Sequence, residues 1–453
     1  MLARDSHNLS ELYKNAAYDG HPLLWNYLLF CITRFSTNVF YMQLLNISIM
    51  AVCVYLFIKH APFKILYSVL IVFGYFFIYE YNIISRNYAV SLLCLTLVFI
   101  QLNRPVKNHL LLSFYLILLS FTHVYSIIVA IAVCCLLIFQ HKNSNIKYVY
   151  ATIIAFTFLL LCTLKVPANH FLFKYDTEPY LSYKRIGKGF SVYLKGFLPI
   201  PDPTANSAWN SNLIISLSKI AGAIFSVICL ISPFFIFRKN KLILFFFYFS
   251  TLTICFFIYV SPLIVSVRYC GFIFVIFIFS FWLQKTIYPQ YVSKNLSYSK
   301  IIIAVLLLHV ISGMYLFTID IKRPFSNSKN LTNYLIDNKL ADKEMCLSNL
   351  CTGPSVSAYL NKKITYLETG EKNSFCKWNT WPFILTKEQI SEKLSLLVKK
   401  DTSLFILSTT YQQGNIETLG QLPGYGFTLI KLHSFEKAIV NSENYTLYYL
   451  IRD

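Results

Sequence analysis

Residues 242–260 read LILFFFYFSTLTICFFIYV and contain no charged side chain. A helix needs roughly 20 apolar residues to cross the hydrocarbon core of a bilayer, because lipid offers backbone groups no hydrogen-bond partner. Other stretches that meet or approach this requirement are Asn38–Ile58, Phe63–Tyr79, Tyr148–Leu164, Leu213–Phe237, Phe272–Leu283 with its flanks, and Ile301–Ile319. These segments predict an integral membrane protein whose chain crosses the bilayer several times.

The composition of the whole chain supports the same class. Of the 453 residues, 56% are hydrophobic, 17% are aromatic and only 13% are charged. A soluble domain contains about 25% charged residues, so this chain lacks the polar surface that it would need in water. With its shorter apolar stretches included, the chain holds about ten segments that could lie in lipid.

The net charge of +20 arises from 40 Lys and Arg against 20 Asp and Glu. Such a balance could indicate nucleic acid as a partner, but the basic residues lie in short loops between apolar segments. Examples are Lys59, Lys64, Arg104, Lys107, Lys142, Lys147, Arg238, Lys239, Lys241, Lys285, Lys294 and Lys300. Anionic lipid headgroups and the positive-inside rule favour this placement, so we expect contact with membrane lipids and none with nucleic acid.

Most of the 12 cysteines lie inside apolar segments, where they act as small hydrophobic residues. Neither a CxxC pair nor a His/Cys cluster has the spacing of metal ligands. Cys346, Cys351 and Cys376 fall in the polar C-terminal part, where an extracytosolic location would permit one disulfide.

Three parts follow one another along the chain. Residues 1–21 form a polar juxtamembrane segment, with a helical pattern around Leu9–Ala17, that we expect outside the cytosol. Residues 22–322 form a multi-helix transmembrane domain that includes a long polar loop at 165–211. Residues 323–453 return to a mixed, charged composition and predict a small soluble α/β domain.

Short apolar runs in this last part have the length of strands, and other stretches have helical periodicity. We expect strands at Phe405–Ser408, Phe427–Leu432 and Tyr445–Ile451. Helices are expected at Asn330–Asn338 and Lys387–Lys399.

Polar residues at the ends of apolar segments are the candidates for a site, because an ionisable group near lipid is costly. Arg4, Asp5, Asp19 and His21 precede the first apolar segment and could supply a base and an acid, or hold a cation. Alternatively, they belong to a solvated helix over Ser6–Ala17 with Asp5 as its N-cap.

Two arginines stand beside tyrosines at similar boundaries, and the first of them follows Glu80, a carboxylate at the end of an apolar segment. Arg86 with Tyr88, and Arg268 with Tyr269, could bind a phosphate through the planar guanidinium while the ring stacks on a sugar or a headgroup. The alternative is an interfacial arginine that snorkels beside an aromatic belt.

His123 lies in the middle of Leu110–Gln140, a stretch too long for one ordinary span. The stretch is either one long helix or two short helices that break at His123, and the imidazole either packs with a hydrogen bond or binds a ligand. Lys184 and Arg185 lie in the long loop and could add positive charge toward a phosphate or pyrophosphate. A surface patch on anionic lipid is the other interpretation.

The order of these motifs carries more information than any one of them. An Asp is followed by His-Pro-Leu at 21–23, Ser-Arg-x-Tyr at 85–88, Thr-His-x-Tyr at 122–125, Arg-Tyr at 268–269 and a terminal domain. Over roughly residues 3–320, this order resembles the GT-C superfamily of glycosyltransferases that use polyprenyl-phosphate sugars. The likeness is to the branch of the protein O-mannosyltransferases and the lipid A aminoarabinose transferases.

The resemblance implies a GT-C-like fold and a set of roles. Asp5 takes the place of the catalytic carboxylate in the first extracytosolic loop, with Asp19 as its substitute, and Arg86 and Arg268 are candidates for the donor phosphate. The family has a helix before this carboxylate, so we expect that the natural chain begins earlier. It also places the C-terminal domain outside the cytosol of a bacterial inner or plasma membrane.

The expected function is transfer of a sugar from a polyprenyl phosphate to a lipid, glycan or protein acceptor. A divalent cation assists some members of the family, although the sequence shows no second paired carboxylate to bind one. The alternatives are a non-catalytic transporter or flippase of lipid-linked glycans and an O-antigen polymerase-type enzyme. One difficulty is that Asp5 and Arg86 share a side of the membrane only if an even number of crossings separates them, whereas three apolar segments do: 22–35, 38–58 and 63–80.

Overall fold

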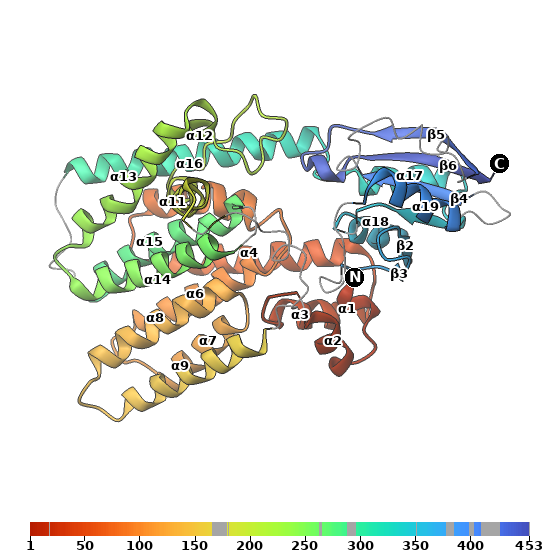
Figure 1. Cartoon of the computed structure of the whole chain (residues 1–453). Helices are drawn as coiled ribbons and strands as arrows, with labels where there is room; N and C mark the ends of the chain where they lie inside the picture. Colours follow the sequence, from red (N-terminus) through yellow and green to blue (C-terminus); the bar gives the residue numbers. More distant parts are fainter. Residues whose placement is uncertain are drawn as a thin grey trace.

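The computed structural model describes residues 1–453 except 18, 165–178, 180, 262–264, 288–295, 350, 377–384, 398–402, 409–425 and 453. Among the described residues, six helices are long and apolar enough to cross a membrane. They are α4 (Val39–His60), α9 (Ile146–Thr163), α13 (Lys219–Phe237), α14 (Lys241–Val260), α15 (Val267–Ile287) and α16 (Leu296–Lys322). Shorter apolar helices are α3 (Leu24–Thr33), α6 (Tyr88–Leu102), α7 (His109–Ser120) and α8 (Val124–Gln140). This helical bundle fits a multi-pass membrane protein (Figure 1).

The bundle has a buried centre and an apolar exterior. In the most apolar window of α15, 83% of the residues are buried, whereas the corresponding share is 22% in α4 and 17% in α9. The outer helices therefore expose large apolar side chains such as Phe40, Ile47 and Leu159. Hydrocarbon is the surrounding that makes such a surface stable.

The predicted span Phe63–Tyr79 is wrong as a single helix. It consists of α5 (Ile65–Val72) and the π-helix η1 (Phe76–Glu80), with a break at Gly74. A Cβ added at Gly313 of α16 would lie 3.0 Å from the Cα of Tyr75, so the two chains cross very closely. The break and the π-helix turn this segment against α16.

Two other segments are also divided. Leu213–Phe237 forms α12 (Leu213–Leu217) and α13, separated by Ser218, whose extended backbone and side-chain oxygen cap α13. Leu110–Gln140 forms α7 and α8, the second of the two alternatives, and His123 is the N-cap of α8. Part of the predicted polar loop is helical as well, because α11 (Tyr183–Phe197) packs against α13, α14 and α15.

The N-terminal segment folds into α1 (Leu2–Asp5) and α2 (Leu9–Ala16). Asp5 ends α1, so its predicted role as the N-cap of the next helix is wrong. Asn8 caps α2 instead, since its side chain accepts a hydrogen bond of 2.9 Å from the Glu11 amide.

Hydrogen bonds join both ends of the short helix α3 to neighbouring segments. Leu24 donates its backbone N–H to Phe121, between α7 and α8, at 3.1 Å. At the other end, Arg34 donates to the carbonyl oxygens of Ala3 and Ser6. Of the described helices between Asp5 and Arg86, α4 alone is long and apolar enough to cross a membrane. That Asp5 or Asp19 shares a side of the membrane with Arg86 therefore stays a prediction.

The C-terminal domain is a mixed six-stranded sheet in the order β3-β2-β1-β4-β6-β5. The strands are β1 (Met345–Leu347), β2 (Ile364–Tyr366), β3 (Lys372–Asn373), β4 (Ser403–Ser408), β5 (Phe427–Phe435) and β6 (Tyr445–Arg452). The helices are α17 (Ser328–Asp337), α18 (Gly353–Leu360), α19 (Lys387–Leu397) and the 3-10 turn η5 (Asn441–Glu443). Strand β1 is parallel to β2 and β4, while β3, β6 and β5 join in antiparallel fashion.

Successive residues of β4 build two cores, because side chains alternate between the faces of a strand. Phe405 and Leu407 pack toward α19, and Leu404 and Ile406 pack toward α17. The predicted strands and the two predicted helices of this domain are confirmed, with some ends shifted by a few residues. The last two residues of the predicted helix Lys387–Lys399 lie outside the described residues.

Candidate functional site

Glu80, the last residue of η1, is a buried carboxylate with three partners. The hydroxyl of Tyr75 and the indole Nε1 of Trp209 each donate to its Oε2 at 3.1 Å. The Nε of Arg268, in the first turn of α15, lies 3.7 Å from its Oε1. The guanidinium also lies over the Trp209 ring, 5.0 Å from the centroid. Arg268 is therefore held by an ion pair and a cation–π contact at once.

Arg86 lies on the loop between η1 and α6, close to Arg268. Repulsion from the Arg268 guanidinium lowers the pKa of Arg86, while Tyr88, Tyr269 and Asp19 oppose the shift. The residue is exposed, and within the described part of the chain its guanidinium has no acceptor or carboxylate in contact. Two neighbouring guanidinium groups with donors to spare can hydrogen-bond an anion with several oxygens.

His21 and Asp19 belong to the same group of charges. Burial lowers the pKa of His21, Asp19 opposes this shift, and Arg86 and Arg268 reinforce it. Asp19 is exposed, and Asn26 of α3 lies 3.5 Å from one of its oxygens. The structure thus brings together four of the predicted residues, from the N-terminal segment, the η1–α6 loop and α15.

Aromatic rings form one wall of this region. Tyr88 stacks on Tyr81, with a centroid distance of 5.1 Å and an interplanar angle of 2°. Tyr88 also contacts the ring of His123 at 4.9 Å, and Tyr269 meets Tyr125 edge-on at 5.9 Å. The predicted aromatic neighbours therefore lie with the arginines, although most of their contacts are with one another.

The C-terminal domain covers the same end of the bundle. Burial raises the pKa of Glu443, whereas hydrogen bonds from serines and the charges of Arg86 and Arg268 lower it. The loop that carries Trp209 joins the domain through a ring contact with Phe325 at 5.3 Å. The two arginines therefore lie between the bundle and the domain.

Three residues of this region were missing from the predicted site: Glu80, Trp209 and Glu443. A carboxylate at the end of an apolar segment is costly to bury, and the sequence marks Glu80 for this reason without assigning it a role. Glu443 lies among ordinary polar residues, and only the fold brings it near the arginines.

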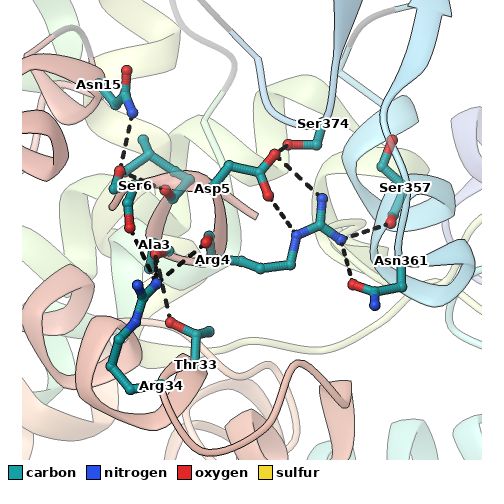
Figure 2. A network of polar contacts seen from close by, with 11 residues as sticks. Ala3, Arg4, Asp5, Ser6, Asn15, Thr33, Arg34, Ser357, Asn361 and Ser374 are labelled. Carbon is teal, nitrogen blue, oxygen red and sulfur yellow. Dashed lines mark hydrogen bonds and ion pairs between the residues drawn. The ribbon is translucent and has the colours of Figure 1, made fainter. Parts of the chain in front are cut away.

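Arg4 and Asp5 lie in a different network, which Figure 2 shows. Arg4 and Asp5 form an ion pair of 2.5 Å, and Ser374 donates a hydrogen bond to the Asp5 carboxylate. Arg4 also donates to the Ser357 carbonyl oxygen at 3.2 Å and to Asn361 at 3.0 Å. These contacts fasten α1 to the C-terminal domain and occupy the carboxylate that the family resemblance had made catalytic.

Lys184 and Arg185 lie in the first turn of α11. Arg185 is buried and points to the Val260 carbonyl oxygen, 3.5 Å away at the end of α14. Further along α11, Lys195 donates to the carbonyl oxygen of Val265 at 3.3 Å, beside the loop that precedes Arg268. Lys195 therefore lies near the start of α15, whereas the contact of Arg185 is at the end of α14, and in the described part of the chain no contact joins Lys184 or Arg185 to the arginine pair.

The donor set of this region does not fit a metal ion. The described residues contain no group of three or more His, Cys, Asp or Glu side chains that could hold one. All 12 cysteines are unpaired, although the thiols of Cys351 and Cys376 lie next to each other.

The arrangement offers two guanidinium groups, a histidine and an exposed carboxylate between a membrane bundle and a covering domain. Such a set can bind a phosphate and move one proton. No family model, curated protein or solved structure matches the chain.

Proposed function

We propose that the chain is a GT-C-like membrane glycosyltransferase that moves a sugar from a polyprenyl-phosphate donor to an extracytosolic acceptor. The observation that carries this proposal is the Arg86–Arg268 pair. Arg268 already has Glu80 as a counter-ion, whereas the exposed guanidinium of Arg86 has no acceptor among the described residues. A lipid phosphate supplies the oxygens that such a pair lacks, and its tail extends along the apolar surface of the bundle.

The chemistry assigns one role to each group. The acceptor hydroxyl oxygen attacks the anomeric carbon of the sugar while the bond from that carbon to the phosphate oxygen breaks. Asp19 takes the hydroxyl proton, and the phosphate leaves with the electron pair. Arg86 and Arg268 stabilise the negative charge that develops on the leaving phosphate.

We assign the base to Asp19 rather than to Asp5. Asp19 is exposed, and its charge influences the pKa of both Arg86 and His21. Asp5 already accepts hydrogen bonds from Arg4 and Ser374. The acceptor class stays open between a lipid, a glycan and a protein of the cell envelope, and the C-terminal domain is assigned to the extracytosolic side of a bacterial inner or plasma membrane.

Binding of a lipid phosphate to the full chain in nanodiscs tests the proposal. Undecaprenyl phosphate is the probe, undecaprenol is the control without phosphate, and Arg104→Ala is the matched arginine variant, since Arg104 follows the opposite end of α6. Loss of one charged hydrogen-bond partner costs roughly 1.5–3 kcal/mol, which weakens binding roughly 10- to 100-fold. We expect this loss in Arg86→Ala and Arg268→Ala only. Equal binding of undecaprenol, or unchanged binding in both variants, would contradict the phosphate site.

Transfer is tested separately from binding. A panel of polyprenyl-phosphate sugars is offered with membrane acceptors to the native chain and to Asp19→Asn. We expect the variant to bind undecaprenyl phosphate normally and to lose transfer. Transfer that survives in the variant would remove Asp19 as the base, and binding without transfer in the native chain would favour a transporter of lipid-linked glycans.

A further inference from the structure

The sequence leaves open which two of Cys346, Cys351 and Cys376 could pair, and the fold sets one of them apart. Cys346 is the middle residue of β1, and successive side chains of a strand point to opposite faces of the sheet. Its thiol packs in the core next to α19, whereas Cys376 packs against the core of the other face, which contains Tyr366 of β2. Cys346 is 3% exposed, and burial raises the pKa of its thiol to about 12. Cys346 is therefore a protonated packing residue, separated by the sheet from Cys376.

Cys351 and Cys376 are neighbours on that other face. The hydrogen bond with the Cys351 thiol, followed by burial, raises the pKa of Cys376. Tyr366 gives the same placement from separate contacts. A Cβ added at Gly353, two residues after Cys351, would lie 2.6 Å from the Tyr366 hydroxyl oxygen, and Cys376 packs against the cluster that contains this ring. Both thiols therefore lie beside one buried tyrosine.

We propose that Cys351 and Cys376 form a disulfide in the folded chain. The oxidising surroundings that this bond needs rest on the extracytosolic side assigned with the proposed function. The oxidant is itself a disulfide, of a protein or of a small molecule. The thiolate of one cysteine attacks a sulfur of the oxidant, whose other sulfur leaves with the electron pair. The second cysteine then displaces the remaining sulfur, so that the two thiols lose two protons and two electrons and the oxidant becomes two thiols.

The bond joins the two segments that hold α1 (Figure 2). Arg4 of α1 contacts α18, and Asp5 accepts a hydrogen bond from Ser374. Cys351 lies just before α18, and Cys376 lies two residues after Ser374. A disulfide restricts the open conformations of the segments that it joins. Oxidation therefore fixes the two halves of this docking surface relative to each other and favours the docked α1.

Differential alkylation of the full chain tests the bond. Cells that express the chain are quenched in acid, free thiols are blocked with N-ethylmaleimide under denaturing conditions, and mass spectrometry identifies cross-linked peptides. We expect a peptide pair joined through Cys351 and Cys376, and an alkylated Cys346. Cys376→Ser should release Cys351 for alkylation, whereas the matched variant Cys162→Ser, which removes an exposed thiol of α9, should keep the pair. Free thiols at both positions, or a bond to Cys346, overturn the proposal.

Oxidation of the purified chain separates the geometry from the location. The chain is reduced in nanodiscs and equilibrated with oxidised glutathione, and we expect the same peptide pair. Its failure to form overturns the neighbouring placement of the thiols. A pair that forms with glutathione but is reduced in the cell contradicts the extracytosolic side and overturns the native bond. If the bond is present in the cell while the chain shows no sugar transfer, the proposed function fails and the disulfide stands.

Hydrogen exchange tests the link to α1. We expect exchange in α1 and α18 to be about 10-fold faster in the reduced chain and in Cys376→Ser than in the oxidised native chain. Cys162→Ser should exchange like the native chain. Equal exchange in the oxidised and reduced chains would overturn the effect of the bond on the docking of α1.

Discussion

Arg268 shows how single residues build this site. Its guanidinium faces the Glu80 carboxylate at 3.7 Å and the Trp209 ring at 5.0 Å, and its backbone carbonyl accepts the Tyr81 hydroxyl at 2.9 Å. These contacts come from η1, from Tyr81 directly after it and from the loop before α12. They hold one guanidinium in place, while Arg86 keeps its donors available for a ligand.

Glu80 is expected to be the residue whose loss disturbs this arrangement most. Removal of one member of a buried ion pair leaves an uncompensated charge, so Glu80→Ala should lower the free energy of unfolding by roughly 3–5 kcal/mol. Glu80→Gln retains an oxygen for Tyr75 and Trp209 and should be milder. Thermal unfolding followed by tryptophan fluorescence in nanodiscs measures the difference. Equal stability of both variants and the native chain would show that the pair is not part of the folded core.

Asp5 and Asp19 are expected to differ in how much each contributes to the stability of the fold. Asp19→Asn should leave the unfolding temperature within about 1 °C of the native chain, because surface substitutions usually change stability by less than about 0.5 kcal/mol. Asp5→Asn should lower it, because Arg4 and Ser374 lose their ionised acceptor. The unfolding temperatures of the two variants, measured side by side, test this contrast. If Asp19→Asn lowers the temperature and Asp5→Asn does not, Asp5 rather than Asp19 is the free carboxylate and the candidate base.

Among the elements, α1 has the most consequential position. Through Arg4 and Asp5 it joins the first residues of the chain to α18 and to the segment that follows β3, as Figure 2 shows. This contact places the N-terminal segment, and with it Asp19 and His21, beside the covering domain. We expect the docking of α1 to depend on pH.

Asp5 determines the sign of this dependence. Burial raises its pKa, but hydrogen bonds from Arg4 and Ser374 outweigh this and hold the pKa below the ordinary 3.8. The docking is therefore fully stabilised above pH 3.8 and weakens as the pH falls through the lower, folded-state value. Hydrogen exchange in α1 and α18, read at neutral pH and near pH 3, should show this loss in the native chain and a smaller change in Asp5→Asn. Exchange that is equally acid-sensitive in both would assign the effect to other groups.

The elements also show what the sequence could reveal. Uncharged runs such as Leu242–Val260 and alternating stretches such as Phe405–Ser408 predict helices and strands because local periodicity determines them. The break at Gly74 and the π-helix depend on the close crossing of α16 at Gly313, which no local pattern records. Tertiary packing also decides where a helix ends. The sequence of Leu110–Gln140 therefore allowed either one long helix or the two helices α7 and α8, and could not choose between them.

The candidate site was partly predictable for a related reason. Arg86, Arg268, Asp19 and His21 stand at segment ends, and a bundle brings segment ends together. The role of Asp5 could not be predicted, since its partner Ser374 lies 369 positions away in the sequence. Whether a carboxylate is free or already bound depends on such distant contacts.

In the whole molecule, the proposed function requires that the candidate site and the loop with Arg104 lie at opposite ends of the helical bundle. Asp19, Arg86, Arg268 and the C-terminal domain belong to the first end, and the loop with Arg104, which follows the other end of α6, belongs to the second. Single cysteines at Lys372 and at Arg104, in a chain without other accessible thiols, should react with a membrane-impermeant reagent from opposite sides of sealed vesicles. Labelling of both from the same side would refute the arrangement of the spans.

The central claim is that Arg86 and Arg268 together hold one phosphate between the bundle and its covering domain. A cryo-EM structure of the full chain in nanodiscs with undecaprenyl phosphate tests it most directly. We expect density for the phosphate within hydrogen-bond distance of both guanidinium groups, with the lipid tail against the apolar helices. Density for the phosphate elsewhere, or a structure in which the two arginines lie on opposite faces of the membrane, would contradict the account.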